Sequence, residues 1–563
     1  MTESRTPTAV DTIADGYLDE WAALDPSLAT YFGIAGHDDR LPEMSPDWYQ
    51  TRSDLRRRTL AALEGAQPVD VNDRITVAAM QEQLGVEEEL RAAGVEESDL
   101  KNIASPLQIL RDTFDLTPSA TVSDWETVAK RLAAVPGAID AYIASLHLAA
   151  QRGSVRPIRQ VRAGIEQSRD NVGADGFFQT YARDAKTEDG TDLPSSLRAD
   201  LNHAAERASD AYDQLAAFLE KELVPLAPER DAVGRELYQT YSRSFLGSSV
   251  DLDETYEWGQ QELARITALM EQTAGRIKDG ASFREALEFL DNDPGRKLHG
   301  TDALQQWMQR TSDAAVAALA DTHFDIPQEI RRLDCRIAPT QQGGIYYTGP
   351  SEDLTTRPGT MWWSVPKGIT EFSTWRELTT VYHEGVPGHH LQVAQTAYRS
   401  NLLNRWRRIA SWVSGHGEGW ALYAELLMAD LGFLNDPADF LGMLDAQSLR
   451  AARVVLDIGV HCELPAPASV GGGAWDYDKA WAFLAEHCAM NEGFRRFELD
   501  RYLGWPGQAP AYKIGERIWL QLREDARTKA GDAFDLKQFH RSALDIGSVG
   551  LDVLRSAVLG EFG

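Results

Sequence analysis

Apolar residues recur every three to four positions along most of the chain, a pattern that predicts amphipathic helices. Ala, Leu, Glu and Arg dominate these stretches, and all four residue types favour helices. The clearest examples are residues 121–151, 198–224, 253–278 and 437–462. Turn sequences rich in Asp, Asn, Gly and Pro interrupt the pattern, as at 189–192 and 291–295. The sequence therefore predicts a mainly α protein.

Strand-like alternation is concentrated in one region of the chain, at residues 332–337, 344–348 and 361–365. We expect two or three short strands there, in a small β-sheet. A weak break over 227–252 separates a helical N-terminal half, 1–245, from a helical C-terminal half, 246–563. The two halves are expected to form one composite domain around a cleft.

The composition excludes several classes of protein. The 563 residues, 43% of them hydrophobic, are enough to bury one large core or two to three smaller ones. The net charge of -30 argues against a nucleic-acid partner or an anionic membrane surface. Three scattered cysteines are too few for a disulfide framework, and no stretch has a signal-peptide core or the ~20 apolar residues of a membrane span. These features predict a cytoplasmic protein without a membrane partner.

The most distinctive chemistry lies in residues 382–392, YHEGVPGHHLQ. The H-E-x-x-H motif of zinc peptidases places two His four residues apart, so that one helix face presents both to one ion. On a straight helix, His389 would lie about 9 Å along the axis and about 120° round from His383, and His390 would lie about 10.5 Å away. Zn–N bonds of about 2.0–2.1 Å exclude both arrangements.

Pro387 changes this expectation. It cannot donate a backbone hydrogen bond to the carbonyl four residues earlier, and it disfavours helical geometry at the preceding residue. Gly385 and Gly388 permit unusual dihedral angles on either side. We therefore expect the helix to break or bulge, with His389 as the second metal ligand. His390 is then its competitor, or a residue that supports the ligands from behind and contacts the substrate. The alternative is an ordinary helix end with surface His residues.

The helix that carries His383 has a predicted start at Thr374. Thr374 and Glu377 have the spacing of a capping box, and apolar residues follow them. His383 should therefore lie about two turns into a regular helix.

A second segment, GHGEGWALYAEL at 415–426, begins another apolar helix. With the His motif it resembles the glutamate-type zincins, in which a Glu on a following helix is the third ligand. Glu418 lies 35 residues after His383, between glycines that allow the backbone to approach a metal. Glu425, two turns later on nearly the same face, is expected to hold a ligand His or to cap a neighbouring helix. The alternative for each Glu is a solvated helix residue.

Together, YHEGVPGHHLQ and GEGWALYAELLMADLG resemble the domain of unknown function 885 family, bacterial proteins grouped with the helical glutamate zincins. That clan includes angiotensin-converting enzyme, thimet oligopeptidase and carboxypeptidase Taq. The resemblance extends over most of the chain through the weaker motifs ALDPSLATYFG, RVVLDIGVH and GQAPAYKIG. It implies a large helical, cleft-containing, zincin-like fold with a small sheet whose edge strand binds extended peptide.

Two His and one Glu leave Zn²⁺ a fourth position for water, which is typical of a catalytic site rather than a structural one. One Zn²⁺ per chain is therefore expected. The expected ligands are His383, His389 and Glu418. Glu384 would take the proton of the polarised water and pass it to the leaving amine. The clan often stabilises the oxyanion with a Tyr or His, and Tyr512 is the leading candidate for this role, followed by Tyr502 and His461.

Arg453, Asp457 and His461 recur at every fourth residue of one predicted helix, so they share a face. Asp457 is expected to orient His461, and Arg453 to hold a substrate carboxylate bidentately. Tyr502 is a further candidate for substrate contact. The alternative for this stripe is an ordinary salt-bridged surface.

The sequence as a whole predicts a zinc-dependent metallopeptidase that hydrolyses short peptides in an enclosed helical cleft. One alternative is a zinc hydrolase of another amide or ester, which would use the same ligands. The other is a non-catalytic helical protein that binds a peptide or metabolite through a vestigial metal site. Glu384 argues against the second alternative, because metal binding alone requires no general base. Mn²⁺ or Co²⁺ would suit the same ligands.

Overall fold

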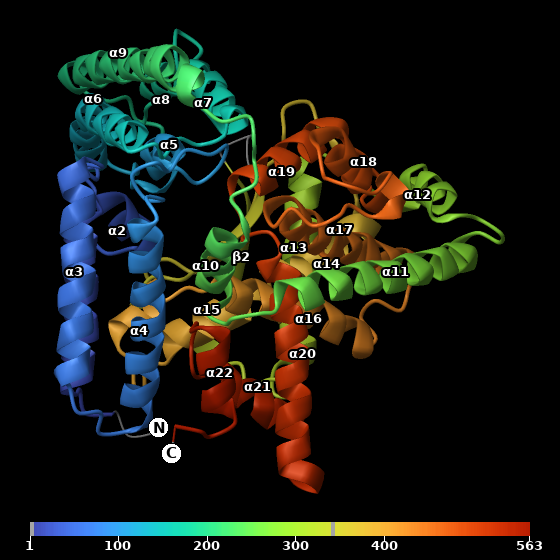
Figure 1. Cartoon of the computed structure of the whole chain (residues 1–563). Coiled ribbons are helices and arrows are strands. Elements are labelled where there is room, and N and C mark those ends of the chain that lie inside the picture. The colour runs from blue at the N-terminus through green and yellow to red at the C-terminus, as the bar shows by residue number, and fades with distance from the viewer. Residues whose placement is uncertain (1–4, 339–343, 563) are drawn as a thin grey trace.

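Helices form most of the protein, as predicted, and two small sheets accompany them. The computed structural model describes residues 5–338 and 344–562. The helices of the first part of the chain, blue to green in Figure 1, stand beside and above those of the second part. These first helices are α1 (Ala9–Leu24), α2 (Pro26–Phe32), α3 (Pro46–Gly65), α4 (Val71–Ala92), α5 (Pro106–Leu116), α6 (Val122–Gln151), α7 (Ile158–Asp170), α8 (Phe177–Arg183), α9 (Ser195–Phe218) and α10 (Arg235–Leu246).

The second part of the chain contains the helices that are predicted to carry the chemistry. They are α11 (Leu252–Ile277), α12 (Phe283–Asp291), α13 (Thr301–Leu319), α14 (Thr374–Glu384), α15 (His389–Tyr398), α16 (Ser414–Asp430), α17 (Pro437–His461), α18 (Tyr477–His487), α19 (Glu492–Gly504), α20 (Ala511–Ala530), α21 (Leu536–Leu544) and α22 (Leu551–Val558). Short 3₁₀ or π turns are η1 (Leu219–Leu223), η2 (Val224–Leu226), η3 (Pro294–Arg296), η4 (Gln328–Ile330), η5 (Trp406–Ala410), η6 (Ala468–Val470) and η7 (Gly531–Ala533).

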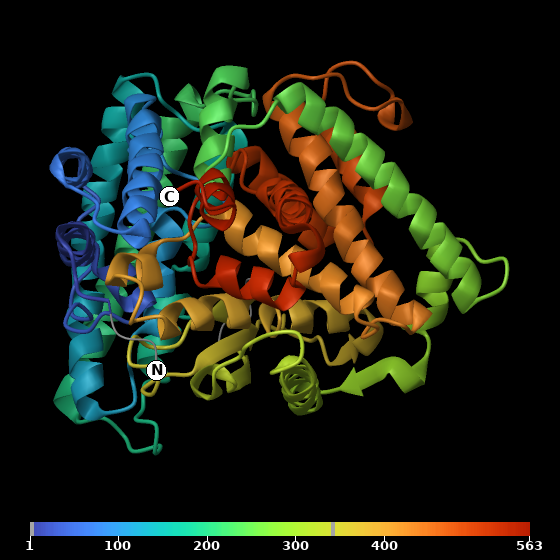
Figure 2. The ribbon, with the colours of Figure 1, turned by 90° about the horizontal axis from the view of Figure 1, so that it is seen from below.

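The helix boundaries predicted from the sequence are most accurate for the segments with the clearest apolar periodicity. The helices predicted at 121–151, 253–278 and 437–462 agree within one residue with α6, α11 and α17. The latter two run side by side, green and orange in Figure 2. The helix predicted at 198–224 ends earlier, because the last turn of α9 widens into the π turn η1.

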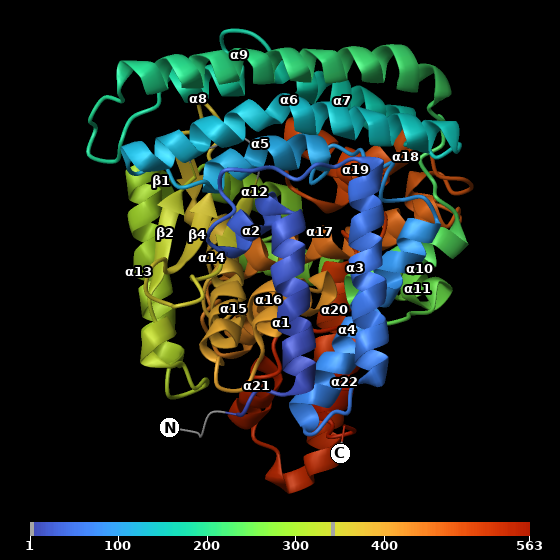
Figure 3. The ribbon, with the colours of Figure 1, turned by 90° about the vertical axis from the view of Figure 1, so that its left-hand side faces the viewer.

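The packed helices share their apolar cores across the predicted boundary between the halves. One core cluster joins α1 and α4 to the C-terminal helices and includes Val10, Met80, Trp420 and Leu554, all completely buried. A second cluster lies within residues 44–223 and binds α5 to α9 together. Figure 3 shows α6, α7 and α9 as a layer across the top of the molecule. The boundary at 245/246 stays a prediction, but the first cluster extends over both of its sides.

The expectation that no segment has the length and apolar composition of a membrane span does not hold for α6. Within the described residues it is the one helix that is long and apolar enough to cross a membrane. A buried core helix passes the same test, and α6 packs along α9 with Val128, Leu132 and Ile139 completely buried. Its apolar composition is therefore accounted for by the second core cluster.

The predicted strands are confirmed and lie against α14. β2 (Leu333–Ile337), β4 (Gly359–Trp363) and β3 (Ile345–Thr348) form a sheet in that order, with β2 parallel and β3 antiparallel to β4. A second sheet pairs β1 (Lys297–His299) with β5 (Glu371–Ser373), which leads directly into α14. Met361 of β4 and Val381 of α14 belong to the same buried cluster. The larger sheet is thus fixed beside the helix that carries His383.

The predicted capping box at the start of α14 is wrong. Ser373 is the N-cap residue and makes no capping hydrogen bond, whereas Thr374 is already helical. The hydroxyl of Thr374 donates instead to the carbonyl of Arg296 at 3.1 Å. The reason is tertiary, because the pairing of β5 with β1 brings that carbonyl next to the helix start.

Candidate functional site

The helix that carries His383 breaks where the sequence predicts. α14 ends one residue after His383, and α15 begins at His389. A cis peptide bond joins Val386 to Pro387 within the break. From α16, the indole N–H of Trp420 donates to the carbonyl of Pro387 at 2.9 Å and holds the break against that helix. The prediction that the helix deforms between the two His residues is therefore confirmed.

Gly388 allows the chain to fold back closely at this break. Its N–H donates to the carbonyl of Tyr382 at 3.1 Å. A Cβ atom at position 388 would lie 1.9 Å from the carbonyl oxygen of His383, which no side chain can tolerate. The absence of a side chain is what brings the start of α15 next to the end of α14.

Three side chains from α14, α15 and α16 converge on one point. The Nε2 atoms of His383 and His389 each lie 3.3 Å from Oε2 of Glu418. The two imidazole rings are perpendicular (89°), with centroids 4.9 Å apart, and both are buried. The structure thus brings together the three residues that the sequence predicts as metal ligands.

Glu384 lies beside this cluster. Ligand-type atoms of Glu384, His383 and His389 all lie within 4.8 Å of one another. Glu384 is 6% exposed, and its Oε2 has no hydrogen-bond partner among the described residues. Burial raises the pKa of this carboxyl, and the rings of His389 and His383 partly offset the effect. A buried carboxylate with a free oxygen is placed to accept a proton at the cluster.

Glu425 holds the first His of the cluster, as one of its two predicted roles requires. Its Oε1 lies 2.7 Å from Nδ1 of His383, and its Oε2 accepts the hydroxyl of Thr379 at 2.5 Å. This contact makes Nδ1 the protonated nitrogen and leaves Nε2 of His383 directed at Glu418. A carboxylate behind a His ligand is the usual outer contact of metal-binding imidazoles.

The electrostatics of the cluster favour a positive charge at its centre. Burial disfavours the charged ring of His383, but the neighbouring carboxylates of Glu418 and Glu425 outweigh burial and raise its pKa to about 10. Burial likewise opposes the charged form of Glu418, yet the rings of His389 and His383 hold its pKa well below the usual range. Protons or a cation must therefore balance these buried carboxylates.

A close crossing of α16 and α20 places Tyr512 next to Glu418. A Cβ atom at Gly515 would lie 2.1 Å from the carbonyl oxygen of Gly415, and one at Gly419 would lie 2.4 Å from the carbonyl carbon of Gly515. Tyr512 lies one turn before this crossing on α20. Burial raises the pKa of its hydroxyl to about 12, and the neighbouring Glu418 carboxylate adds to the effect. The structure therefore brings the predicted oxyanion donor to the cluster.

His390 points away from its neighbour His389 and has no free nitrogen for a metal or a substrate. Its Nε2–H donates to the carbonyl of Ile330 at 2.8 Å, so Nδ1 accepts the hydroxyl of Tyr347 at 3.0 Å. Burial lowers the pKa of His390 to about 4, which keeps the ring neutral. The prediction of His390 as a competing ligand or substrate contact is corrected to a bridge between α15 and β3.

Arg453 and Tyr502 are paired with a third residue that the sequence did not single out. The Arg453 guanidinium donates to Oε2 of Glu498 at 2.7 Å and to the hydroxyl of Tyr502 at 2.7 Å. That hydroxyl donates to the same Glu498 oxygen at 2.5 Å. All three residues are buried, so Arg453 is not available to a substrate carboxylate and Tyr502 is not available to a substrate. Both predictions are corrected, because the tertiary fold supplies a carboxylate from α19.

Asp457 does not orient His461, although they lie one turn apart on α17. Oδ1 of Asp457 accepts the hydroxyl of Tyr238 at 2.7 Å and the N–H of Gly507 at 2.9 Å. His461 donates through Nε2 to the carbonyl of Tyr502 at 3.0 Å and stacks on Tyr238. His461 is completely buried, and burial lowers its pKa to about 4. It packs between α10 and α19, so the prediction of a catalytic role is corrected.

Several residues near the cluster escaped sequence reasoning. Thr379 lies one helical turn before His383, and this spacing would have been enough to propose it. Trp412 precedes α16, is 42% exposed and has its ring 5.9 Å from that of His389. Tyr31 of α2 is 54% exposed, and both Arg357 and Glu418 act on its pKa. No local pattern marks these last contacts, because they join distant parts of the chain.

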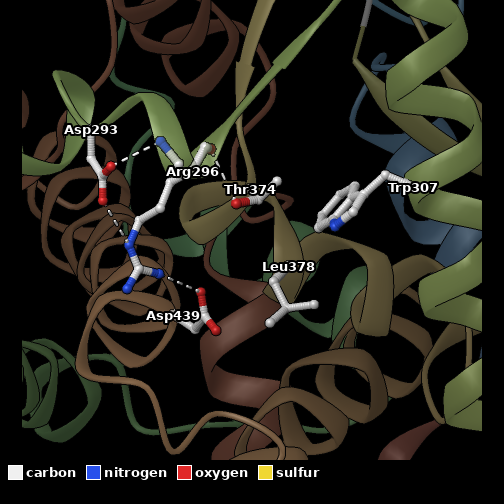
Figure 4. A pocket seen from close by; sticks show the side chains of 7 residues that line it. Asp293, Arg296, Trp307, Thr374, Leu378 and Asp439 are labelled. Atoms are coloured by element: carbon white, nitrogen blue, oxygen red, sulfur yellow. Dashed lines mark hydrogen bonds and ion pairs between the residues drawn. The ribbon is translucent and has the colours of Figure 1, made fainter.

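One cavity of about 350 Å³ lies apart from the cluster, at the N-terminal end of α14. Its lining residues are Asp293, Gly295, Arg296, Trp307, Thr374, Leu378 and Asp439. Figure 4 shows Arg296 between Asp293 and Asp439, with Trp307 on the opposite side. Arg296 also pairs with Asp436 at 2.7 Å. Because Thr374 lies about 13 Å along the helix from His383, the cavity is separate from the converging ligands.

Comparison with known protein families identifies the family of this chain. The sequence profile of the family described as "Bacterial protein of unknown function (DUF885)" matches residues 26–558. Among curated proteins, no match was found.

Two solved structures have a similar fold over nearly their whole length. The "putative lipoprotein from Colwellia psychrerythraea" is 22% identical with a TM-score of 0.84, and the match covers 99% of this chain and 100% of that one. A "putative lipoprotein of unknown function from Shewanella oneidensis" is 16% identical with a TM-score of 0.73, and the match covers 98% and 100% of the two chains. At these identities the likeness shows a common fold.

Proposed function

We propose that this chain, which belongs to the DUF885 family of bacterial proteins of unknown function, is a zinc-dependent hydrolase of short peptides. The observation that carries the proposal is the convergence of His383, His389 and Glu418, with both His Nε2 atoms 3.3 Å from one carboxylate oxygen. Two His and one Glu form the ligand set of catalytic rather than structural zinc sites. Glu384 beside them is the further group that hydrolysis requires.

The donor atoms of the cluster fit Zn²⁺. Oε2 of Glu418 is buried and has no hydrogen-bond partner among the described residues, although two imidazole nitrogens face it. A buried carboxylate in that position needs a balancing positive charge. Zn²⁺ would supply this charge while both imidazoles remain neutral, and imidazole nitrogen with carboxylate oxygen suits zinc better than Mg²⁺ or Ca²⁺.

The residues around the cluster then have distinct roles. Zn²⁺, when bound, lowers the pKa of water toward ~7 and polarises a carbonyl oxygen. Glu384 accepts the proton of the attacking water through its free Oε2 and passes it to the leaving amine. The Tyr512 hydroxyl, protonated at neutral pH, donates a hydrogen bond to the developing oxyanion. Glu425 keeps Nε2 of His383 directed at the ligand position.

A zincin-like cleft with an edge strand for the substrate is part of the proposal. β3 is an edge strand of the larger sheet, which packs against α14 and α15. A peptide paired with such an edge would be extended, and its backbone would be held independently of its side chains. Trp412, whose ring lies 5.9 Å from that of His389, and Tyr31 are both partly open to solvent and would line this cleft.

Metal analysis combined with peptide cleavage tests the proposal. The purified chain should contain about one zinc, and a chelator should abolish cleavage of a mixed-peptide library as followed by mass spectrometry. Glu384→Gln should reduce turnover by about 10²–10⁴-fold and leave zinc bound, because the amide cannot accept a proton. Glu206→Gln on the surface of α9 is the matched control and should change neither property.

The outcomes also separate the alternatives. No stoichiometric zinc, together with unchanged properties of His383→Ala, would remove the metal site from consideration. Zinc without peptide cleavage, but with Glu384-dependent cleavage of a small amide or ester, would identify a hydrolase of another substrate class. Zinc with no turnover on any of these substrates would leave a binding protein.

A further inference from the structure

Arg357 is a cation without a carboxylate partner in a protein that has an excess of carboxylates. The chain contains 86 Asp and Glu residues against 56 Lys and Arg residues. Among the described residues, the Arg357 guanidinium makes no hydrogen bond or ion pair, and its Nε is buried without a partner. Arg453, which was predicted from the sequence to hold a substrate carboxylate, is by contrast paired with Glu498. A half-buried guanidinium with free donors is costly unless a ligand completes it.

The backbone around Arg357 is well defined. Arg357 precedes β4 in a loop that closes on Ser351, whose N–H donates to the Arg357 carbonyl at 2.9 Å. The N–H of Arg357 donates back to the Ser351 hydroxyl at 2.9 Å. Within the loop, Asp353 accepts the N–H groups of Thr355 and Thr356 at 3.0 and 2.9 Å. These bonds hold the backbone of the loop at Arg357.

The guanidinium lies where α2 approaches the sheet. A Cβ atom at Gly33, the residue that ends α2, would lie 3.4 Å from Nη2 of Arg357. Burial lowers the pKa of Arg357, and the hydroxyls of Tyr347 and Tyr31 partly offset this effect. The neighbours that these observations identify are two tyrosines and a glycine, and none of them is a carboxylate.

β4, which begins two residues after Arg357, packs against α15, the helix that begins at His389. Gly359, two residues after Arg357, lies against His390, because a Cβ there would be 2.6 Å from Nδ1 of that ring. His390 is the sequence neighbour of the predicted ligand His389. Tyr31 is 54% exposed. The charges of Arg357 and Glu418 both act on the pKa of the Tyr31 hydroxyl, so Tyr31 lies within electrostatic range of both groups.

We infer that Arg357 binds the terminal carboxylate of the substrate, so that the proposed peptidase acts on short peptides from their free C-terminal end. The inference rests on the proposed function. A guanidinium offers two parallel N–H donors to a carboxylate, and this geometry is specific as well as strong. The Tyr31 hydroxyl makes no hydrogen bond within the described residues, and it acts on the pKa of Arg357.

Binding to metal-free protein tests the carboxylate site without turnover. The full chain, freed of metal by a chelator, would be titrated by calorimetry with an N-acetyl dipeptide and with its C-terminal amide. We expect at least about tenfold tighter binding of the acid, since charge-assisted bonds are lost in the amide. Arg357→Gln should remove this preference, Arg357→Lys should keep part of it, and Arg207→Gln on the surface of α9 should keep all of it.

Three results would overturn the inference. They are equal affinity of the wild type for acid and amide, no detectable binding of either probe, and a preference that survives in Arg357→Gln. Thermal unfolding of each variant separates a lost site from a lost fold, and Arg357→Lys provides the second variant if the Gln protein is unstable.

Cleavage assays distinguish failure of this inference from failure of the proposed function. The zinc-loaded chain should cleave free peptides with kcat/KM at least about tenfold above that for C-terminal amides, and Arg357→Gln should act mainly through KM. Equal cleavage of acids and amides would leave the peptidase and remove the carboxylate site. An acid preference in binding without any zinc-dependent cleavage would leave the site and remove the peptidase.

Discussion

Two buried polar clusters lie in the C-terminal half, and the sequence marked residues in both as candidates for chemistry. In the first, His383, His389 and Glu418 face one another, and Oε2 of the Glu has no hydrogen-bond partner among the described residues. In the second, Arg453 and Tyr502 share Glu498 at 2.7 and 2.5 Å. Both clusters are buried and carry charge, but only the first keeps donor atoms free and directed at a common point.

The difference lies in how the hydrogen-bonding capacity of each cluster is used. In the second cluster, burial opposes the charges, but Arg501 and Arg453 outweigh it and lower the pKa of Glu498 to about 2. This buried ion pair joins α17 to α19. The first cluster leaves buried carboxylate oxygens of Glu384 and Glu418 without hydrogen-bond partners among the described residues, and such groups are costly unless protons or a ligand balance them. A free, convergent set of buried donors is therefore a better sign of function than charge or burial alone.

The largest expected effect separates two adjacent His residues. His389→Ala should lose zinc and at least about 10³-fold in activity, because a ligand is removed. His390→Ala should keep zinc but lower the free energy of unfolding by about 2–3 kcal/mol, because a buried hydroxyl and a carbonyl lose their partner. Zinc analysis and urea unfolding of both variants measure the two effects. Loss of zinc from the His390 variant would contradict the assignment.

Breaking the second cluster should change stability and not metal content. Glu498→Gln leaves Arg453 buried opposite a neutral amide and should cost about 3–5 kcal/mol of the free energy of unfolding. Glu492→Gln, on the exposed side of the same helix, should cost less than about 1 kcal/mol. Urea unfolding gives the costs, and zinc stoichiometry should equal that of the wild type. A parallel loss of zinc would show that the two clusters are one site.

A smaller effect should follow from the outer contact of His383. Glu425→Gln keeps the shape of the side chain but weakens its hold on Nδ1, so zinc affinity should fall by about 10–100-fold. Thr379→Val, which removes the hydroxyl that orients Glu425, should have a weaker effect in the same direction. Competition with a fluorescent zinc chelator measures both affinities. Unchanged affinity in both variants would show that His383 is held by packing alone.

The smallest effect concerns Asp457, where burial raises the pKa to about 7. The folded state holds this proton more tightly than the unfolded state, so the stability it contributes is present below about pH 4 and is lost as pH rises through 7. Asp457→Asn does not titrate, so its stability relative to the wild type should grow by about 1–3 kcal/mol between pH 4 and 8. Urea unfolding across this range measures the change, and a constant difference would show that Asp457 titrates normally.

The parts of the site that local chemistry controls were predictable from the sequence. Pro387 and the two glycines implied the break in the helix, because they remove a hydrogen bond and a side chain wherever they occur. The spacing of Glu418 and Glu425 on one helix was equally local. The direction of the His390 side chain could not be predicted from the sequence, because it depends on a carbonyl of η4 and on Tyr347 of β3.

The helical class, the small sheet and the segments that carry the candidate ligands follow from the sequence alone, since periodicity and turn chemistry act over a few residues. Tertiary structure decided which polar side chains are completed by partners and which remain free. Glu498 reaches Arg453 from 45 positions away, whereas Arg357 finds no carboxylate among the described residues. These outcomes depend on the packing of distant helices, because a charge is satisfied by whatever group the fold brings near it and not by its neighbours in the chain.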